Sequence, residues 1–303
     1  MTASARPRER LVDYAFRMAW ATTRRTPEPV GTRVLEGVAD RVWKARGSGV
    51  RQLESNLRRA APTLEAAELG ELSRAALRSY FRYWHEVFRL PTWSQERTVD
   101  SVVTTGEAAL REEFGRGRGA IIALPHMANW DHAGAWASRT GMPVSTVAER
   151  LRPESLFDRF VSYREQLGME VIALSGAGNP TLALKSSLEE GRLICLLADR
   201  DLTGAGVEVP LFGEDARMPV GPAALSRITG APLFALTLHY RGPLLQLDFS
   251  PPISARPGRD GLVQMTSAVA EWFSAGIART PADWHMMQPV FMSDLRPAGE
   301  GVD

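Results

Sequence analysis

From residue 102 onward, short apolar segments alternate with amphipathic ones, and this alternation limits the fold more than any other feature. The apolar segments have the length and β-branched content of buried strands, whereas the segments between them carry apolar residues at helical spacing. Such alternation predicts an α/β fold with a central, mostly parallel sheet flanked by helices. The expected strands span residues 102–105, 119–124, 143–147, 169–174, 193–198, 207–211, 234–240 and 244–249. The main expected helices between and after them span residues 106–114, 131–139, 155–167, 181–190 and 262–277.

The first third of the chain has helical patterning instead, and predicts an N-terminal helical layer. The expected helices span residues 8–25, 31–46, 51–60 and 64–90, and the last stops before Pro91 because the residue ahead of a proline disfavours helix. We expect one domain over residues 1–303, with a basic, aromatic helical layer in 1–95 and an α/β core in 96–303. The nearly apolar helix at 8–25 is bracketed by arginines, so it fits either a membrane interface or a place on the core.

Charge is unevenly distributed along the chain, although the net charge is only +1. Residues 1–100 contain 18 Lys and Arg against 12 Asp and Glu. The long helix at 64–90 concentrates this excess, because five basic side chains fall on one face of it: Arg74, Arg78, Arg82, His85 and Arg89. This stripe fits either a solvated basic face above an aromatic core contact or a patch for anionic lipid headgroups or donor phosphates.

The apolar run 119–124 stops at Pro125 and His126, which places this histidine at the carboxyl end of a predicted strand. In open α/β sheets, ligands bind outside the carboxyl ends of the strands. With Asn129 as the cap of the next helix, Asp131 lies in the first helical turn, where a carboxylate is favoured. Asp131 is then expected to orient the His126 imidazole, which would make His126 a general base. The alternative is a structural histidine beside an ordinary first-turn acid.

Further polar side chains follow other predicted strands and are expected at the same edge of the sheet. Glu149 follows the strand at 143–147, and Asp199 and Arg200 follow the strand at 193–198. Downstream, Arg217 precedes a helix that begins at Gly221. Free N–H groups at a helix start and a nearby arginine suit an anion, but a tight loop is an equally good interpretation.

Composition and missing motifs exclude several classes of protein. The single cysteine, Cys195, excludes a disulfide framework and indicates a reducing compartment, so we expect the cytoplasm. No apolar run approaches the roughly 20 residues that span a bilayer. The chain also has no G-x-S-x-G elbow, no P-loop and no zinc-ligand spacing, so we expect no metal.

The residues His126-Met-Ala-Asn-Trp-Asp131 resemble the H-x4-D motif of the glycerolipid acyltransferase superfamily. An R-x3-G element at Arg164, a strand ending in Asp199 and the block GVEVPLFGEDARMPVGPAALSRITGAP follow in order. This order is similar to the late lipid A acyltransferases and, more closely, to the actinobacterial phosphatidylinositol mannoside acyltransferases. Lipid A enzymes usually have a glycine where this chain has Ala128 and a glutamate where it has Asp131, which favours the mannoside branch.

The resemblance implies a peripheral enzyme on the cytoplasmic face of the plasma membrane. It would move a long acyl chain, such as palmitoyl, from acyl-CoA to the 6-hydroxyl of a mannose in phosphatidylinositol mono- or dimannoside. His126 would be the base and Asp131 its partner, without a covalent intermediate. Substrate contacts are expected from Glu149, Arg164, Asp199, Arg200, Arg217, Gly221 and His285. The expected partners are acyl-CoA, the mannoside and an anionic membrane surface, with no cofactor, metal or nucleic acid.

Three alternatives to this function remain open at the level of sequence. The acceptor could be another glycolipid or a lysophospholipid. The protein could be a thioesterase or lipase-like hydrolase, which the missing serine elbow disfavours. It could also be a non-catalytic lipid-binding protein, which would tolerate the loss of Asp131.

Overall fold

The predicted α/β architecture is confirmed by a computed structural model that describes residues 18, 20–149, 154–174 and 179–295. A central sheet of seven strands has the order β1-β9-β8-β2-β5-β3-β4. Five neighbouring strands, from β8 to β4, run parallel, while β9 pairs antiparallel with β8 and β1 runs parallel to β9. The strands of this sheet are β1 (Val102–Thr105), β2 (Ala120–Leu124), β3 (Val144–Ala148), β4 (Met169–Ala173), β5 (Leu193–Leu197), β8 (Leu233–Arg241) and β9 (Leu244–Phe249).

A separate antiparallel hairpin, β6 (Val207–Leu211) with β7 (Glu214–Met218), packs beside helix α11. The sequence predicted only its first strand. The second strand alternates charged residues with Ala216 and Met218, and a pattern this short is weak on its own. The hairpin fixes the backbone of Arg217, which bonds to Val290 and so ties the hairpin to the chain end.

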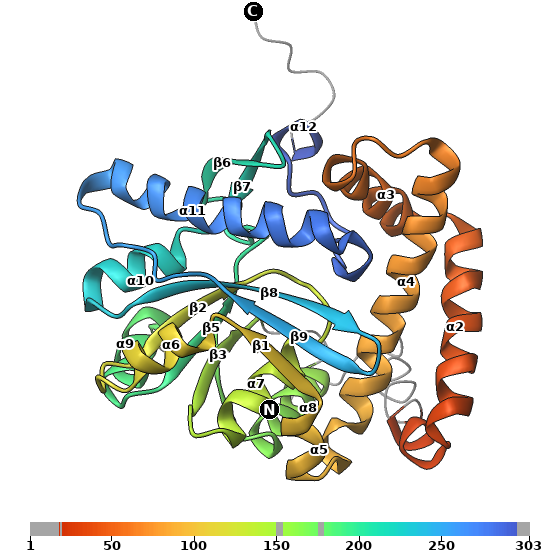
Figure 1. The fold of residues 1–303 in the computed structure, drawn as a ribbon, viewed down its shortest axis with the longest axis horizontal. Helices are drawn as coiled ribbons and strands as arrows, with labels where there is room; N and C mark the ends of the chain where they lie inside the picture. Colours follow the sequence, from red (N-terminus) through yellow and green to blue (C-terminus); the bar gives the residue numbers. More distant parts are fainter. Residues whose placement is uncertain (1–17, 19, 150–153, 175–178, 296–303) are drawn as a thin grey trace, which may run out of the picture.

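Helices cover both faces of the sheet (Figure 1). Helix α10 contacts both α9 and α11, while α7 packs against β3 and β4 and α8 packs against β4. The helices of the core are α5 (Gln95–Asp100), α6 (Glu107–Phe114), α7 (Trp130–Arg139), α8 (Glu154–Gln166), α9 (Pro180–Glu189), α10 (Gly221–Thr229), α11 (Gly258–Arg279) and α12 (Met292–Leu295), with short 3₁₀ turns η1 (Leu90–Thr92) and η2 (Pro281–Asp283).

The centre of the sheet is fully buried, and one glycine sets where β2 begins. All five residues of β2 are buried, as expected for a strand between two helical layers. Gly119 precedes the strand with φ of 62°, and a Cβ there would lie 2.5 Å from the Arg192 carbonyl oxygen. Only glycine fits this left-handed position at such close approach, so the register that leads to His126 is fixed at its start.

The N-terminal helical layer consists of α2 (Glu28–Ala45), α3 (Ser48–Ala60) and α4 (Ala66–Arg89), which stand together at one side of the sheet (Figure 1). Helix α4 begins with a capping box in which the side chains of Glu65 and Glu68 each accept from the other's backbone N–H. A small core of its own, with Leu53, Leu57 and Leu77, holds the layer together. The predicted helix at 64–90 is therefore confirmed.

The basic side chains of the α4 stripe pair with other groups of the protein, although those of Arg74 and Arg78 remain 32% and 41% exposed. The stripe is a partly solvated face, as one of the two predictions had it, and its binding of anionic lipids or phosphates stays a prediction. Arg74 and Arg78 each make two hydrogen bonds to Asp40 of α2. Arg89 donates to the carbonyl oxygens of Thr23 and Thr26. The remaining members behave similarly, since Arg82 bonds Glu86 and the Gly242 carbonyl, and His85 is buried. The stripe docks neighbouring segments onto α4, because guanidinium groups at helical spacing match a carboxylate on the facing helix.

The predicted helix at 8–25 falls mostly outside the described residues, although residues 20–25 are helical. Trp20 packs on Phe88 of α4 and on Tyr163 of α8, with ring centroids 5.2 and 5.4 Å apart.

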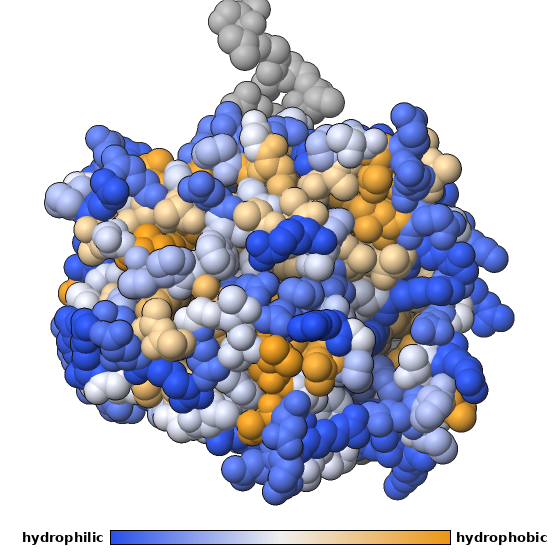
Figure 2. All heavy atoms as spheres, viewed as in Figure 1, coloured by the Kyte–Doolittle hydropathy of each residue, from blue (hydrophilic) through white to orange (hydrophobic). Residues whose placement is uncertain are grey.

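Hydrophilic side chains cover most of the face in Figure 2, with hydrophobic ones in small separate groups. In the described part of the chain, no helix has both the length and the hydropathy to cross a membrane.

Candidate active site

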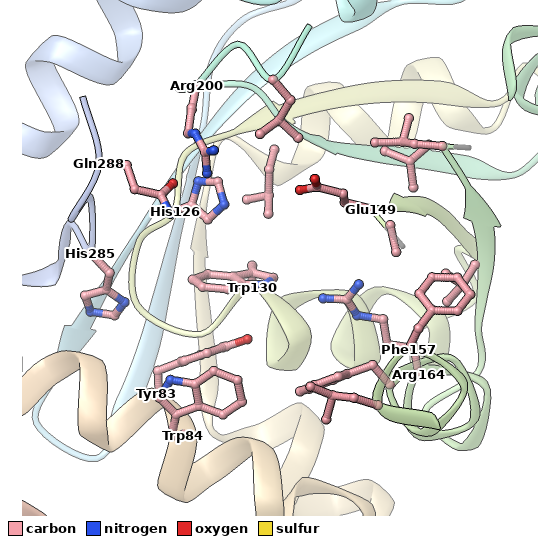
Figure 3. A pocket seen from close by; sticks show the side chains of 18 of the residues that line it. Tyr83, Trp84, His126, Trp130, Glu149, Phe157, Arg164, Arg200, His285 and Gln288 are labelled. Atoms are coloured by element: carbon pink, nitrogen blue, oxygen red, sulfur yellow. The ribbon is translucent and has the colours of Figure 1, made fainter. Parts of the chain in front are cut away.

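A cavity of about 580 Å³ lies at the carboxyl ends of β2, β3, β4 and β5, where the strand alternation predicts a ligand site. Its size is typical of ligand pockets. Helix α4 and helix α8 form its aromatic and aliphatic walls, and residues 285–288 form a further side. A few polar side chains converge in it, and Figure 3 labels five of them: His126, Glu149, Arg164, Arg200 and His285.

His126 forms a close pair with Asp199, the residue that follows β5 after Ala198. The distance from His126 Nδ1 to Asp199 Oδ1 is 2.7 Å. Asp199 Oδ2 accepts the backbone N–H of His126 and the indole N–H of Trp284, each at 2.9 Å. Asp199 is fully buried, whereas the His126 side chain is 31% exposed and lines the cavity. The carboxylate therefore holds the ring at Nδ1 and leaves Nε2 for a substrate.

Asp199 is an ionised acceptor in this arrangement. Burial by itself raises the pKa of the carboxyl, but the opposing effects of the His126 charge and of the hydrogen bonds from His126 and Trp284 are larger together, so the pKa is lowered. A carboxylate that accepts three N–H donors has no proton to give. Asp199 thus fixes His126 in the tautomer with hydrogen on Nδ1, and the bare Nε2 can accept a proton.

The predicted pairing of His126 with Asp131 was wrong. Asp131 lies in the first turn of α7, and Asn129 caps this helix as expected. However, Asp131 Oδ1 accepts from Arg164 Nε at 2.7 Å, and Oδ2 accepts from the Tyr83 hydroxyl at 2.9 Å. Both oxygens face away from His126 because helix α7 directs them towards α8 and α4.

Trp130 separates His126 from the Asp131–Arg164 ion pair. Its ring stacks on Tyr83 at a centroid distance of 4.1 Å and meets the His126 ring edge-on at 5.5 Å. Figure 3 shows Trp130 between His126 and Arg164. Asp131 therefore positions Arg164 and Tyr83, while Asp199 positions His126. Burial of the Tyr83 hydroxyl, together with the charge of Asp131, raises the pKa of Tyr83 well above its usual value, so the phenol keeps its proton and donates a hydrogen bond.

The turn that carries His126 is held by the segment near the end of the chain. Met127 forms an antiparallel bridge with Trp284. The Ala128 N–H donates to the Asp283 carbonyl, and the His285 N–H donates to the His126 carbonyl, each at 2.8 Å. Ala128 has φ of 43°, a left-handed conformation that costs a non-glycine residue free energy. A glycine would adopt this conformation without strain.

His285 is a second imidazole in the cavity, and it is 6% exposed. Its Nε2 lies 3.0 Å from the Ser79 hydroxyl, and Tyr80 and Tyr83 surround the ring at centroid distances of 5.6 and 6.2 Å. Burial, together with the charge of His126, lowers the pKa of His285 to about 3. His285 is therefore neutral at physiological pH and does not compete with His126 for a proton.

We expect the neutral state of His285 to make the protein less stable in mild acid. Between pH 3 and the unfolded pKa of about 6.5, the unfolded chain binds a proton that the folded chain does not, so stability falls as pH falls. From pH 7.5 to pH 5 the free energy of unfolding should drop by about 2 kcal/mol through this residue. Urea unfolding of the wild type and of His285→Gln at both pH values measures this drop in the free energy of unfolding. An equal pH dependence in the two proteins would contradict the assignment.

The structure brings most of the predicted site residues together, but not all. Glu149, Arg164, Arg200 and His285 line the cavity with His126. Asp199 lies beneath His126 and not on the cavity surface, so its predicted role as a substrate contact was wrong. Arg217 pairs with Glu208 on the β6–β7 hairpin, and Gly221 begins α10. Neither lines this cavity, and their predicted substrate contacts stay predictions.

The sequence did not indicate the roles of Tyr83, which donates to Asp131, or of Trp284, which donates to Asp199. Neither has a local motif, because each reaches its partner from a distant part of the chain.

Within the described residues, no group of three or more His, Cys, Asp or Glu side chains could hold a metal ion.

An α/β fold with a His–Asp pair beside an apolar cavity is the arrangement expected of an acyl-transferring enzyme, and comparison with known proteins identifies the family. The sequence profile described as bacterial lipid A biosynthesis acyltransferase matches residues 2–293. The chain therefore belongs to this family, as its motifs predicted, and is an acyltransferase.

Within the family, the chain is similar to two curated mycobacterial proteins. It is 42% identical over 286 residues to the phosphatidylinositol mannoside acyltransferase of Mycolicibacterium smegmatis, covering 94% of this chain and 93% of the relative. It is also 42% identical over 287 residues to the protein of the same name from Mycobacterium tuberculosis strain H37Rv, covering 93% of this chain and 89% of the relative. The resemblance expected from the sequence is confirmed over nearly the whole chain.

Proposed function

We propose that the protein transfers a long fatty acyl chain from acyl-CoA to the 6-hydroxyl of a mannose in a phosphatidylinositol mannoside. The names and coverage of the mycobacterial relatives support this acceptor. The observation that supports the chemistry is that His126, which lines a largely apolar cavity, is paired with the buried Asp199. The motif aspartate, Asp131, takes no part in this pair.

In the proposed reaction, His126 Nε2 removes the proton from the mannose hydroxyl as its oxygen attacks the thioester carbonyl. The new C–O bond gives a tetrahedral oxyanion, which collapses with cleavage of the C–S bond. The imidazolium returns its proton to the departing thiolate, so free CoA and the acylated lipid are formed. Since a thioester is already activated, the reaction requires no acyl-enzyme, cofactor or metal.

The two walls of the cavity suit the two substrates. Phe157, Phe160 and Leu156 of α8 with Trp84 of α4 supply an apolar surface for the acyl chain. Polar groups at the opposite rim, Glu149 and Arg200, and the guanidinium of Arg164 suit the hydroxyls and phosphate of a glycolipid headgroup. Figure 3 shows Glu149 and Arg164 directed into the same space.

Asp131→Asn is expected to weaken acceptor binding without changing proton abstraction. The amide removes the charge that orients the Arg164 guanidinium, which is held by a single bond from Nε. The amide oxygen can still accept from Nε, but replacing a charged acceptor by a neutral one corresponds to about a tenfold rise in acceptor KM. Steady-state kinetics with varied mannoside and fixed palmitoyl-CoA measures it. A fall in kcat with unchanged acceptor KM would show that Asp131 acts on the chemistry instead.

Mass spectrometry of the products tests the proposal as a whole. Purified protein is incubated with palmitoyl-CoA and a panel of phosphatidylinositol mannosides, other glycolipids and lysophospholipids. Acylation of a mannoside at the mannose 6-position supports the proposal. Acylation of a different lipid would show that the proposed acceptor is wrong. Free palmitate without an acylated lipid would indicate a hydrolase, and no turnover would favour a lipid-binding protein.

We also propose that the chain works as one domain bound peripherally to the cytoplasmic face of the plasma membrane, where both substrates would meet. An anionic membrane surface is the proposed partner, and the excess of basic residues in the first third of the chain supports it. Sedimentation with phosphatidylinositol-containing vesicles tests this. Binding that is equal for neutral and anionic vesicles would contradict the electrostatic part.

A further inference from the structure

The segment after η2 places a second hydrogen-bonded chain beside the catalytic histidine. Asp283 Oδ1 accepts from the Ser79 hydroxyl at 2.5 Å, and the same hydroxyl lies 3.0 Å from His285 Nε2. The other carboxylate oxygen of Asp283 accepts the backbone N–H of Tyr240 at 2.8 Å. Asp283, Ser79 and His285 thus form a connected row that ends in the active-site cavity.

The row determines which nitrogen of His285 carries hydrogen. Ser79 has one hydroxyl hydrogen, and Asp283 Oδ1 accepts it. Burial raises the pKa of Asp283, but the bonds from Ser79 and the Tyr240 N–H favour its ionised form, which can only accept. The bond between Ser79 and His285 must then use the hydrogen of Nε2 and a lone pair of the hydroxyl oxygen. Nδ1 is consequently bare, and can only accept a hydrogen bond.

Nδ1 of His285 is buried and has no partner within the described residues. Buried polar atoms in proteins nearly always have one, so an exception in an active-site cavity needs an explanation. The backbone N–H of His285 donates to the carbonyl of His126 at 2.8 Å, which places the two imidazoles on adjacent extended segments. Both rings also pack against Trp130, at centroid distances of 5.5 Å for His126 and 6.4 Å for His285, and both line the cavity. A sugar whose hydroxyl is deprotonated by His126 would therefore have neighbouring hydroxyls near His285.

We propose that His285 binds the acceptor sugar by accepting a hydrogen bond at Nδ1 from a hydroxyl that is not itself acylated, and that Ser79 and Asp283 are positioning residues that set its tautomer. This inference rests on the proposed function. It gives the enzyme a means to distinguish a polyhydroxy acceptor from a lipid with a single free hydroxyl. A site built to bond a hydroxyl rejects analogues that lack it.

The tautomer can be measured without any substrate. The protein has five histidines, so ¹⁵N-histidine labelling gives few ring signals, and His285→Gln assigns the one of interest. We expect the hydrogen of His285 on Nε2 in the wild type. In Asp283→Asn, the amide oxygen must face the Tyr240 N–H, so the amide nitrogen donates to Ser79. Ser79 then donates to Nε2, and the hydrogen of His285 moves to Nδ1. Hydrogen on Nδ1 in the wild type would overturn the proposal.

Fluorinated acceptors test the contact itself. In a phosphatidylinositol monomannoside carrying fluorine in place of one non-acylated mannose hydroxyl, the substituent can no longer donate. At the position that contacts His285, the wild type should show about a tenfold higher acceptor KM, the loss expected for one hydrogen bond. Asp283→Asn should discriminate much less between hydroxyl and fluorine, because its Nδ1–H can donate to fluorine. His285→Gln, which can still bond Ser79, should also lose the discrimination.

Controls separate this contact from a structural effect. His132→Gln alters another buried histidine, which bonds the Thr98 carbonyl and does not line the cavity, so it should discriminate as the wild type does. The KM for palmitoyl-CoA should stay within about twofold in all variants, since a change there would assign Nδ1 to the donor instead. If no fluorinated position affects the wild type, or if His285→Gln discriminates normally, the inference fails. If the wild type acylates no mannoside at all, the proposed function fails, while the tautomer result still stands.

Discussion

Replacing His126 by alanine is expected to lower the rate of CoA release by about 10²- to 10⁴-fold, the usual contribution of a general base. The buried Asp199 carboxylate holds Nδ1 of the His126 imidazole, and the ring remains accessible from the cavity. Without it, the mannose hydroxyl must attack while still protonated. The measurement is the release of free thiol from palmitoyl-CoA in the presence of the mannoside.

The fold should survive this change. The His126 backbone N–H keeps its bond to Asp199, and the bridge between Met127 and Trp284 does not involve the side chain. A thermal unfolding midpoint within a few degrees of wild type would establish this, and acyl-CoA binding should persist. Near-normal turnover in a folded His126→Ala protein would remove His126 from the mechanism.

Asp199→Asn is expected to lower turnover by about 10³- to 10⁴-fold, although the two side chains have nearly the same shape; in serine proteases a carboxylate-to-amide change beside the catalytic histidine costs about that much. Two N–H donors, from His126 and Trp284, point at Oδ2, so the amide oxygen must occupy that position. The amide nitrogen then faces His126 Nδ1 and donates to it. His126 must carry its hydrogen on Nε2, where it cannot accept the proton of the substrate.

Asp131→Asn is the matched control for this prediction, because it removes the carboxylate that the H-x4-D motif singles out. We expect the Asp199 variant to lose kcat and the Asp131 variant to lose acceptor affinity. The opposite distribution would mean that the catalytic complex reorganises around Asp131. A second control is Asp248→Asn on β9, whose carboxylate lies near Arg279 and His239 outside the cavity, and which should retain activity.

Much of the fold follows from the sequence because its strand and helix signals are local. The apolar runs that become β2 and β5, and the break at Pro91 after α4, are each determined by residues within a few positions. The sequence also placed His126 and Glu149 correctly at the carboxyl edge of the sheet. It did not indicate that β9 and β8 would lie between β1 and β2, because strand order depends on contacts between distant segments.

The basic stripe of α4 illustrates the same limit. Helical spacing correctly placed Arg74 and Arg78 on one face, but the spacing within one helix contains no information about its neighbour. Asp40 comes from α2, more than 30 residues earlier in the chain, and its bonds to Arg74 and Arg78 form a helix-helix contact that the spacing could not indicate.

For the active site, the sequence by itself determined that a histidine follows a central strand, that Asn129 caps the next helix, and that Asp131 lies in the first turn of that helix. Only the tertiary structure decided which carboxylate meets the imidazole. His126 and Asp131 are close in sequence, but α7 turns Asp131 towards Arg164 and Tyr83. Asp199 lies 73 residues away, yet β2 and β5 are adjacent parallel strands, so the residues that follow them meet at one edge of the sheet.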